Sequence, residues 1–246
     1  MSNYKYLSVL ISAILISLGI FSAGFYIGKG LHGFRDPSHF VTVKGIAERN
    51  VKSDLGVWQI NYHELGDNLM TVNQQLQHDQ TIVIQFLTSH GFKNNELFLQ
   101  PAKVEDRLTG YQSSEQKTKI QRYVVTSGIL VRSQQVDLID KTNALTGLLL
   151  QQGVPISFNT NPYYYFTQLD ALRPAMMADA THSARLVAEQ FAKDASTRLG
   201  SIQHASQGLF QFMSRDAMST EYGDSALSSI YKKIRLVTTI DYQLKR

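Results

Sequence analysis

Residues 171–200 read ALRPAMMADATHSARLVAEQFAKDASTRLG, the clearest pattern in this chain. Apolar residues recur at helical spacing along one narrow stripe: Met177, Ala180, Ala184, Val187, Ala188, Phe191, Ala192, Ala195 and Leu199. Pro174 suits the first turn of a helix, and Gly200 predicts its end. Because much of the stripe is alanine, we expect this helix to lie very close to the layer that it covers.

The rest of the chain alternates between strand and helix periods. Strand patterns precede and follow two further predicted helices, at about 67–90 and 135–152, which end at Gly91 and Gly153. The predicted strands cover 40–47, 55–63, 97–104, 122–132, 154–159, 202–212 and 230–244. The resulting order, ββαββαβαββ, predicts an α+β domain: antiparallel sheet with three main helices on one face.

The amino terminus carries a nearly uncharged apolar run from Leu7 to Ile27. A helix rises about 1.5 Å per residue, so this run reaches roughly 30 Å, the thickness of a bilayer core. Cleaved signal peptides have a shorter apolar stretch of about 7–15 residues. We therefore favour an uncleaved signal anchor, a single transmembrane helix, over a cleaved signal that leaves the protein free in the periplasm.

Two further features of this run concern its packing and its direction. Gly24 and Gly28 form a GxxxG pair, a spacing that lets two membrane helices approach closely. The flanking charges are Lys5 on one side and Lys29 and Arg35 on the other, so the charge bias is close to a tie. The expected organisation is a signal anchor over 1–30, a linker over 31–39 and one further domain over 40–246, which the resemblance given below places in the periplasm.

Composition excludes several function classes. The net charge is only +4, and the densest basic group, Lys232, Lys233 and Arg235, falls in an alternating strand and is interpreted as a solvated face. This is not the footprint of a nucleic-acid binder. The chain has no cysteine, which excludes disulfides, thiolate metal sites and cysteine nucleophiles.

The sequence offers no arrangement of residues typical of catalysis. No two histidines are three or four residues apart, so the helical metal spacing is missing. Glycine-rich phosphate loops and the GxSxG nucleophile motif are missing as well. We expect a protein that is not an enzyme and has no catalytic, cofactor or metal residues.

The aromatic run Tyr163, Tyr164, Tyr165 and Phe166 is the best candidate for a contact surface. As a strand it puts Tyr163 and Tyr165 on one side and Tyr164 and Phe166 on the other. One pair can enter the core while the other contacts a partner, since tyrosine is enriched at protein interfaces. A strand buried on both faces is the alternative.

The order of short motifs resembles the SIMPL-domain family, which includes bacterial periplasmic immunogenic proteins. The opening strand Val41-Thr42-Val43-Lys44-Gly45-Ile46-Ala47 is similar to the family's V-x-V-x-G-x-A/G pattern. The third helix is the most specific match, since its spaced alanines and the pair Leu199-Gly200 resemble the family's helix motif. The resemblance covers about residues 40–244.

The resemblance implies a domain outside the cytoplasm that builds ring- or channel-like homo-oligomers, with links to envelope integrity and oxidative stress. It supplies no catalytic residues. The expected protein is therefore a self-assembling envelope protein held in the bacterial inner membrane, with its soluble domain in the periplasm, itself as partner, and no cofactor. The alternative is a periplasmic binding module for an envelope partner or an unidentified ligand.

Overall fold

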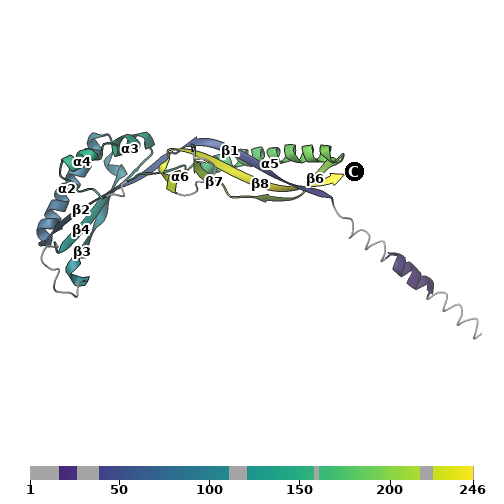
Figure 1. Cartoon of the computed structure of the whole chain (residues 1–246), viewed down its shortest axis with the longest axis horizontal. Helices are drawn as coiled ribbons and strands as arrows, with labels where there is room; N and C mark the ends of the chain where they lie inside the picture. Colours follow the sequence, from purple (N-terminus) through teal and green to yellow (C-terminus); the bar gives the residue numbers. More distant parts are fainter. Residues whose placement is uncertain (1–16, 27–38, 111–120, 158–160, 217–223, 246) are drawn as a thin grey trace, which may run out of the picture. The chain divides into compact units, whose positions relative to one another are not determined.

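The computed structural model describes residues 17–26, 39–110, 121–157, 161–216 and 224–245. The chain divides into two compact units, a larger one of residues 44–185 and 206–239 and a smaller one of 1–43, 186–205 and 240–246. The strands form two sheets (Figure 1), whereas the sequence predicts one antiparallel sheet with three helices on one face. The α+β class is confirmed.

One sheet has the order β3-β4-β2-β5 and lies in the larger unit. Its strands are β2 (Leu55–Gly66), β3 (Leu97–Asp106), β4 (Tyr123–Ser133) and the short edge strand β5 (Tyr163–Tyr165). All three pairings are antiparallel, and β2 and β4 are in register from Gly56 opposite Ser133 to Gly66 opposite Tyr123. Alternation along β2 buries Trp58, Ile60 and Tyr62 on one face.

Helices cover that buried face (Figure 1). They are α2 (Leu69–Ser89), α3 (Val136–Asn143) and α4 (Gly147–Gln151). Asn68 caps α2, accepting from the amides of Met70 and Thr71 at 2.9 and 3.4 Å. The predicted helix over 135–152 is thus two short helices. Of the predicted strand over 154–159, the described residues 154–157 contribute one isolated bridge, from Ile156 to Tyr62.

The other sheet has the order β1-β8-β6, with β7 also paired to β8. Its strands are β1 (Phe40–Lys52), β6 (Arg198–Gln207), β7 (Gln211–Ser214) and β8 (Tyr231–Lys245). The strand predicted over 202–212 is therefore two strands, β6 and β7. The alternation predicted for the last strand is confirmed, because Ile234, Leu236, Ile240 and Tyr242 are all buried.

Helix α5 (Leu169–Asp194) packs on this second sheet through small side chains. Its buried stripe is Met176, Ala180, Ala184, Ala188 and Ala192, one residue in every four. The close approach predicted from the alanines is confirmed at Gly45 of β1. A Cβ placed there would meet the backbone oxygen of Ala180 and lie 2.7 Å from the Cβ of Ala184.

Two details of α5 differ from the sequence prediction. Met177, Val187 and Phe191 were assigned to the buried stripe but are 38%, 39% and 55% exposed. The reason is that a helix resting on a sheet through alanine buries a stripe only one residue wide. The helix also ends at Asp194, and the left-handed turn after it belongs to Ser196, with φ 53°. Gly200 lies inside β6, whereas Gly91 and Gly153 do follow helices with φ 103° and 87°.

The basic group of β8 is only partly solvated. Lys232 is 2% exposed. Its ammonium donates to the backbone oxygens of Ala226 and Ser229 at the end of the short helix α6 (Asp224–Ser228), the latter at 2.8 Å. Burial lowers the pKa of Lys232 to about 8. The interpretation of Lys232 as part of a solvated face is wrong, because backbone carbonyls at the end of α6 accept the hydrogen bonds that its ammonium would otherwise donate to water.

Candidate functional site

The aromatic run forms the edge strand β5, where the predicted alternation is confirmed. Tyr163 and Tyr165 are 43% and 38% exposed, and Tyr164 is buried. The hydroxyl of Tyr164 donates to Asp140 at 3.3 Å, and burial beside this carboxylate raises the pKa of Tyr164. Phe166, just after the strand, packs against the core cluster of Ala47, Met176 and Ile234. The strand therefore offers two exposed tyrosines.

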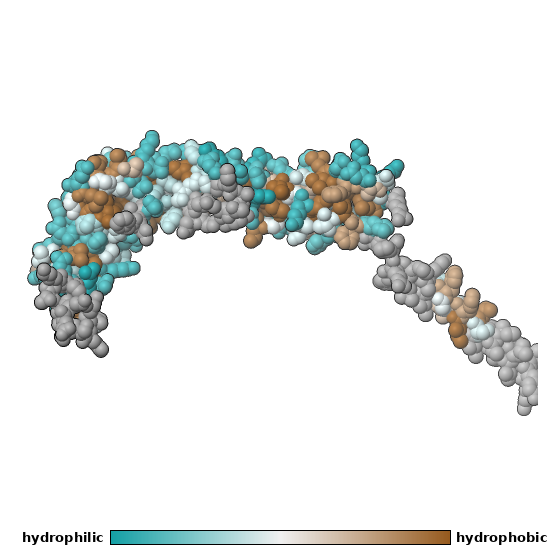
Figure 2. Space-filling model, viewed as in Figure 1, coloured by the Kyte–Doolittle hydropathy of each residue, from teal (hydrophilic) through white to brown (hydrophobic). Residues whose placement is uncertain are grey.

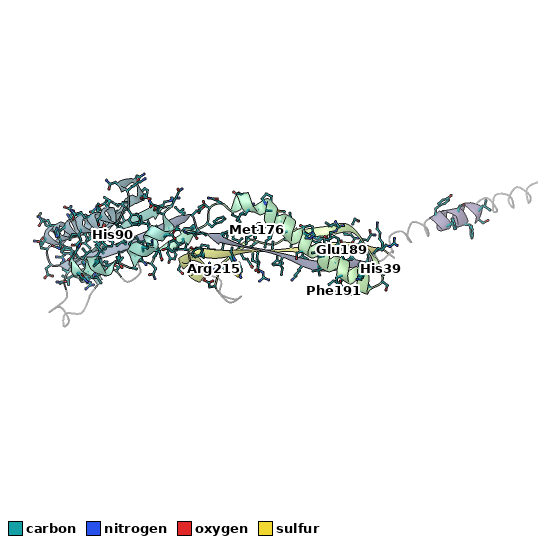
Figure 3. The ribbon with its side chains drawn as sticks, turned by 90° about the horizontal axis from the view of Figure 1, so that it is seen from above. His39, His90, Met176, Glu189, Phe191 and Arg215 are labelled. Carbon is teal, nitrogen blue, oxygen red and sulfur yellow. The ribbon has the colours of Figure 1, made fainter. Side chains whose placement is uncertain are left out.

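A second set of exposed apolar side chains lies on the carboxyl-terminal half of α5, in the smaller unit. Leu186 and Phe191 are 54% and 55% exposed, and Val187 is 39% exposed. Figure 2 shows brown surface where Figure 1 places this helix. Figure 3 labels Phe191 and Glu189, which a spacing of two residues puts on opposite sides of α5. We call Leu186, Val187 and Phe191 the α5 flank.

Val187 and Phe191 of the α5 flank lie on the β1 side of the helix. Asp179 and Ser183 each lie one residue before a member of the buried stripe. Asp179 contacts Arg49 at 2.6 Å, and Ser183 accepts from the backbone amide of Ile46 at 3.4 Å. Arg49 and Ile46 are both on β1. Val187 and Phe191 continue this row at four-residue spacing. The opposite edge of the same sheet is β6, whose residues from Ser201 to Gln207 are all exposed, with Ile202 at 49%.

A pair of carboxyl groups in the larger unit was missed by the sequence analysis. Asp79 lies on the inner face of α2, between Leu76 and Val83, and is only 1% exposed. Its Oδ1 accepts from the side-chain amide of Gln75 at 3.3 Å. Glu64 of β2 faces it across the helix–sheet contact. The signal available in the sequence was Asp79 itself, an aspartate at a position where the helical pattern of α2 calls for an apolar residue.

Burial dominates the electrostatics of this pair. Desolvation, followed by the hydrogen bond to Asp79 and repulsion from it, raises the pKa of Glu64 to about 7. Burial also raises the pKa of nearby Tyr62, which is fully buried. Glu64 and Gln75 also line an open groove of about 410 Å³, which Asp79 does not reach.

A larger polar groove of about 870 Å³ lies where β2 begins and β4 ends. Four exposed amide side chains line it, those of Asn95, Gln134, Gln135 and Gln168. Asp54, also in the lining, accepts from the amide and hydroxyl of Thr167 at 2.8 and 2.9 Å. Such a groove suits a polar ligand.

The membrane-related predictions concern mainly residues that the structure does not describe. Residues 17–26 are helical, with Leu18 and Phe21 66% and 79% exposed. Within the described part of the chain, no helix is both long and apolar enough to cross a membrane. Most of the predicted anchor, Gly28 among it, lies outside the described residues. A Cβ on Gly24 would meet open space.

A family model described as SIMPL, a protein of unknown function (DUF541), matches residues 41–236. The chain belongs to the SIMPL family. The resemblance seen in the motif order is thereby confirmed for both sheets and for α5. No curated protein matches this SIMPL protein in sequence.

Proposed function

We propose that this SIMPL protein is a membrane-tethered envelope protein that assembles with copies of itself and catalyses no reaction. The observation that carries the proposal is the pair of unlike surfaces on the smaller unit: the α5 flank beside β1, and the exposed edge strand β6. Exposed apolar side chains that cluster in this way are typical of interaction sites.

The arrangement of the two surfaces favours a ring over a two-fold dimer. β1 and β6 are the opposite edges of one sheet, so a contact between the α5 flank of one copy and β6 of the next is head-to-tail. Head-to-tail contacts close into rings when the rotation between copies allows it. An edge strand also presents unpaired backbone groups that a neighbouring copy can satisfy.

The test uses two charged variants of the full chain in mild detergent, Phe191→Asp and Ile202→Asp. We expect the wild-type protein to form a large assembly and each variant to sediment as a monomer in analytical ultracentrifugation. Each variant keeps one intact surface, so an equal mixture of the two should form dimers and nothing larger. A strictly monomeric wild-type protein would overturn the proposal.

Two matched variants serve as controls. Leu209→Asp places the same charge at a residue that is 87% exposed in the larger unit, and we expect it to assemble normally. The double variant Tyr163→Ser and Tyr165→Ser removes the exposed tyrosines of β5 and tests the contact predicted there. An unchanged assembly size in that variant would exclude this strand from the interface.

The second candidate function is a binding module for an envelope ligand or partner. The polar groove of about 870 Å³ favours it, because no described residue engages the four amides in its lining and each offers a donor and an acceptor. Co-purification of a non-protein ligand with the wild-type chain, lost in Gln134→Ala and Gln135→Ala, would support this function. It can coexist with assembly, since groove and assembly surfaces share no residues.

A further inference from the structure

The polar groove of about 870 Å³ crosses one end of the β3-β4-β2-β5 sheet. Its lining comes from the start of β3, the end of β4, the start of β2 and the segment after β5, represented by Phe98, Arg132, Leu55 and Thr167. Neighbouring strands lie about 4.8 Å apart, so a groove that crosses four strands is about 14 Å long. This length suits an extended chain of small units.

The charges of the groove cancel, and its carboxylates are already engaged. The two cations in the lining are Lys93 and Arg132, and the two carboxylates are those of Asp54 and Glu96. Glu96 accepts from the backbone amide of Lys93 at 2.9 Å. Asp54 accepts from the backbone amide and the hydroxyl of Thr167. A lining without net charge favours an uncharged ligand over a polyanion.

The hydrogen-bonding groups left over are planar. They are the exposed side-chain amides of Asn95, Gln134, Gln135 and Gln168, each with a donor and an acceptor. Within the described part of the chain, no carboxylate pairs with Arg132, whose guanidinium adds donors. Such groups match a ligand that carries many hydroxyl groups, because a hydroxyl also donates and accepts.

An exposed aromatic ring lies among these polar groups. Phe98 lines the groove and is 47% exposed. It lies opposite Leu130 of β4, so it shares a face of the sheet with Arg132, two residues further along β4. The ring offers an apolar surface to the ligand beside the guanidinium. The ligand should therefore have an apolar face as well as hydroxyl groups.

We propose that the groove binds a pyranose oligosaccharide, an inference that rests on the second candidate function, the binding module. A pyranose ring is uncharged, carries hydroxyl groups around its rim and presents C–H groups on its faces. The hydroxyl groups bind the amides and the guanidinium, and one C–H face packs on Phe98. Successive rings of the chain follow the groove across the four strands.

The test is isothermal titration calorimetry on the full chain in a detergent without a sugar head group. The probes are chitotetraose, cellotetraose and maltotetraose, which separate a chain with acetamido groups from chains with hydroxyl groups alone. Sorbitol is the control ligand, since it has hydroxyl groups but no ring. We expect at least one tetrasaccharide to bind saturably and sorbitol not to bind. The matching disaccharide should bind about tenfold more weakly, because it fills only part of the groove.

Matched variants locate the binding. Phe98→Ala, and Gln134→Ala combined with Gln135→Ala, should each weaken it by about tenfold, because each removes contacts that the ligand makes. Phe98→Tyr keeps the ring, and Gln85→Ala removes an exposed amide of α2 outside the groove, so both should bind as the wild type does. Circular dichroism establishes that each variant is folded.

Three results would overturn the proposal: no binding of any tetrasaccharide, equal binding of sorbitol, or equal weakening by Gln85→Ala. The binding function can stand when the saccharide fails. A co-purified ligand that contains no sugar after acid hydrolysis, and that the Gln134→Ala and Gln135→Ala variants lose, would establish that outcome. Sedimentation of the groove variants tests assembly separately, and we expect it to be unchanged.

Discussion

Gly45 is the residue on which the contact between α5 and β1 depends. Its missing side chain allows the Ala180 backbone oxygen and the Ala184 Cβ to approach β1. Gly45→Ala must therefore push the helix away from the strand, and we expect the free energy of unfolding to fall by about 2–3 kcal/mol. Chemical denaturation measures this.

Gly147→Ala is the matched control for that substitution. A Cβ on Gly147 meets open space at the start of α4. We expect no loss of stability there, and a gain of up to about 1 kcal/mol, because alanine is the better helix former. Equal losses in both variants would contradict the steric argument at Gly45.

Glu64 makes the stability of the folded protein depend on pH. Its pKa in the folded protein is about 7, above the ordinary value near 4.5. The folded state therefore binds a proton more tightly than the unfolded state, so this stabilisation is complete below about pH 4.5 and disappears as the pH rises through 7. We expect the free energy of unfolding to drop by about 1–3 kcal/mol over that range.

Two variants separate the causes of this pH dependence. Glu64→Gln should abolish the drop, and Asp79→Asn should only reduce it, because desolvation, the largest cause, remains. Urea midpoints at pH 5 and pH 8 measure the pH dependence of stability in both variants. If the urea midpoint changed between pH 5 and pH 8 by the same amount in the wild type and in Glu64→Gln, the raised pKa of Glu64 would be contradicted.

At the scale of elements, helix α2 depends on its cap. The side chain of Asn68 accepts from two amides that otherwise have no helical partner. We expect Asn68→Ala to lower the free energy of unfolding by about 1 kcal/mol and Asn68→Asp to preserve it. Thermal unfolding followed by circular dichroism compares them, and equal melting temperatures for Asn68→Ala and the wild type would contradict the cap.

Elements were predictable from the sequence where one face is buried and the other is not. The alternation of β8, β2 and β4 and the period of α2 identified these elements, with ends that differ by a few residues. Prediction was less successful where a segment divides. The helix predicted over 135–152 breaks at Ala144–Thr146, and the strand over 202–212 breaks where Leu209 points into solvent. Both breaks interrupt an apolar pattern that continues across them.

At the scale of the whole molecule, the amino-terminal run predicts a tether. If residues 1–30 stay attached, the membrane fraction should contain the intact chain of 27.7 kDa. Deleting residues 1–30 should release the protein to the soluble fraction while assembly through α5 and β6 persists. Intact mass spectrometry and sedimentation measure these outcomes, and a shortened protein free in the periplasm would establish the cleaved alternative.

The sequence by itself determined the fold class, the family and the strands and helices with a one-sided apolar pattern, because periodicity is a local property of the chain. It also determined that Tyr163 and Tyr165 lie opposite Tyr164. Only the tertiary structure decided which side chains lack a partner. Val187 and Phe191 have the same local pattern as the buried alanines, yet the sheet covers only a stripe one residue wide. Asp79 has the position of a core residue, and its interaction with Glu64 exists only because β2 packs against α2.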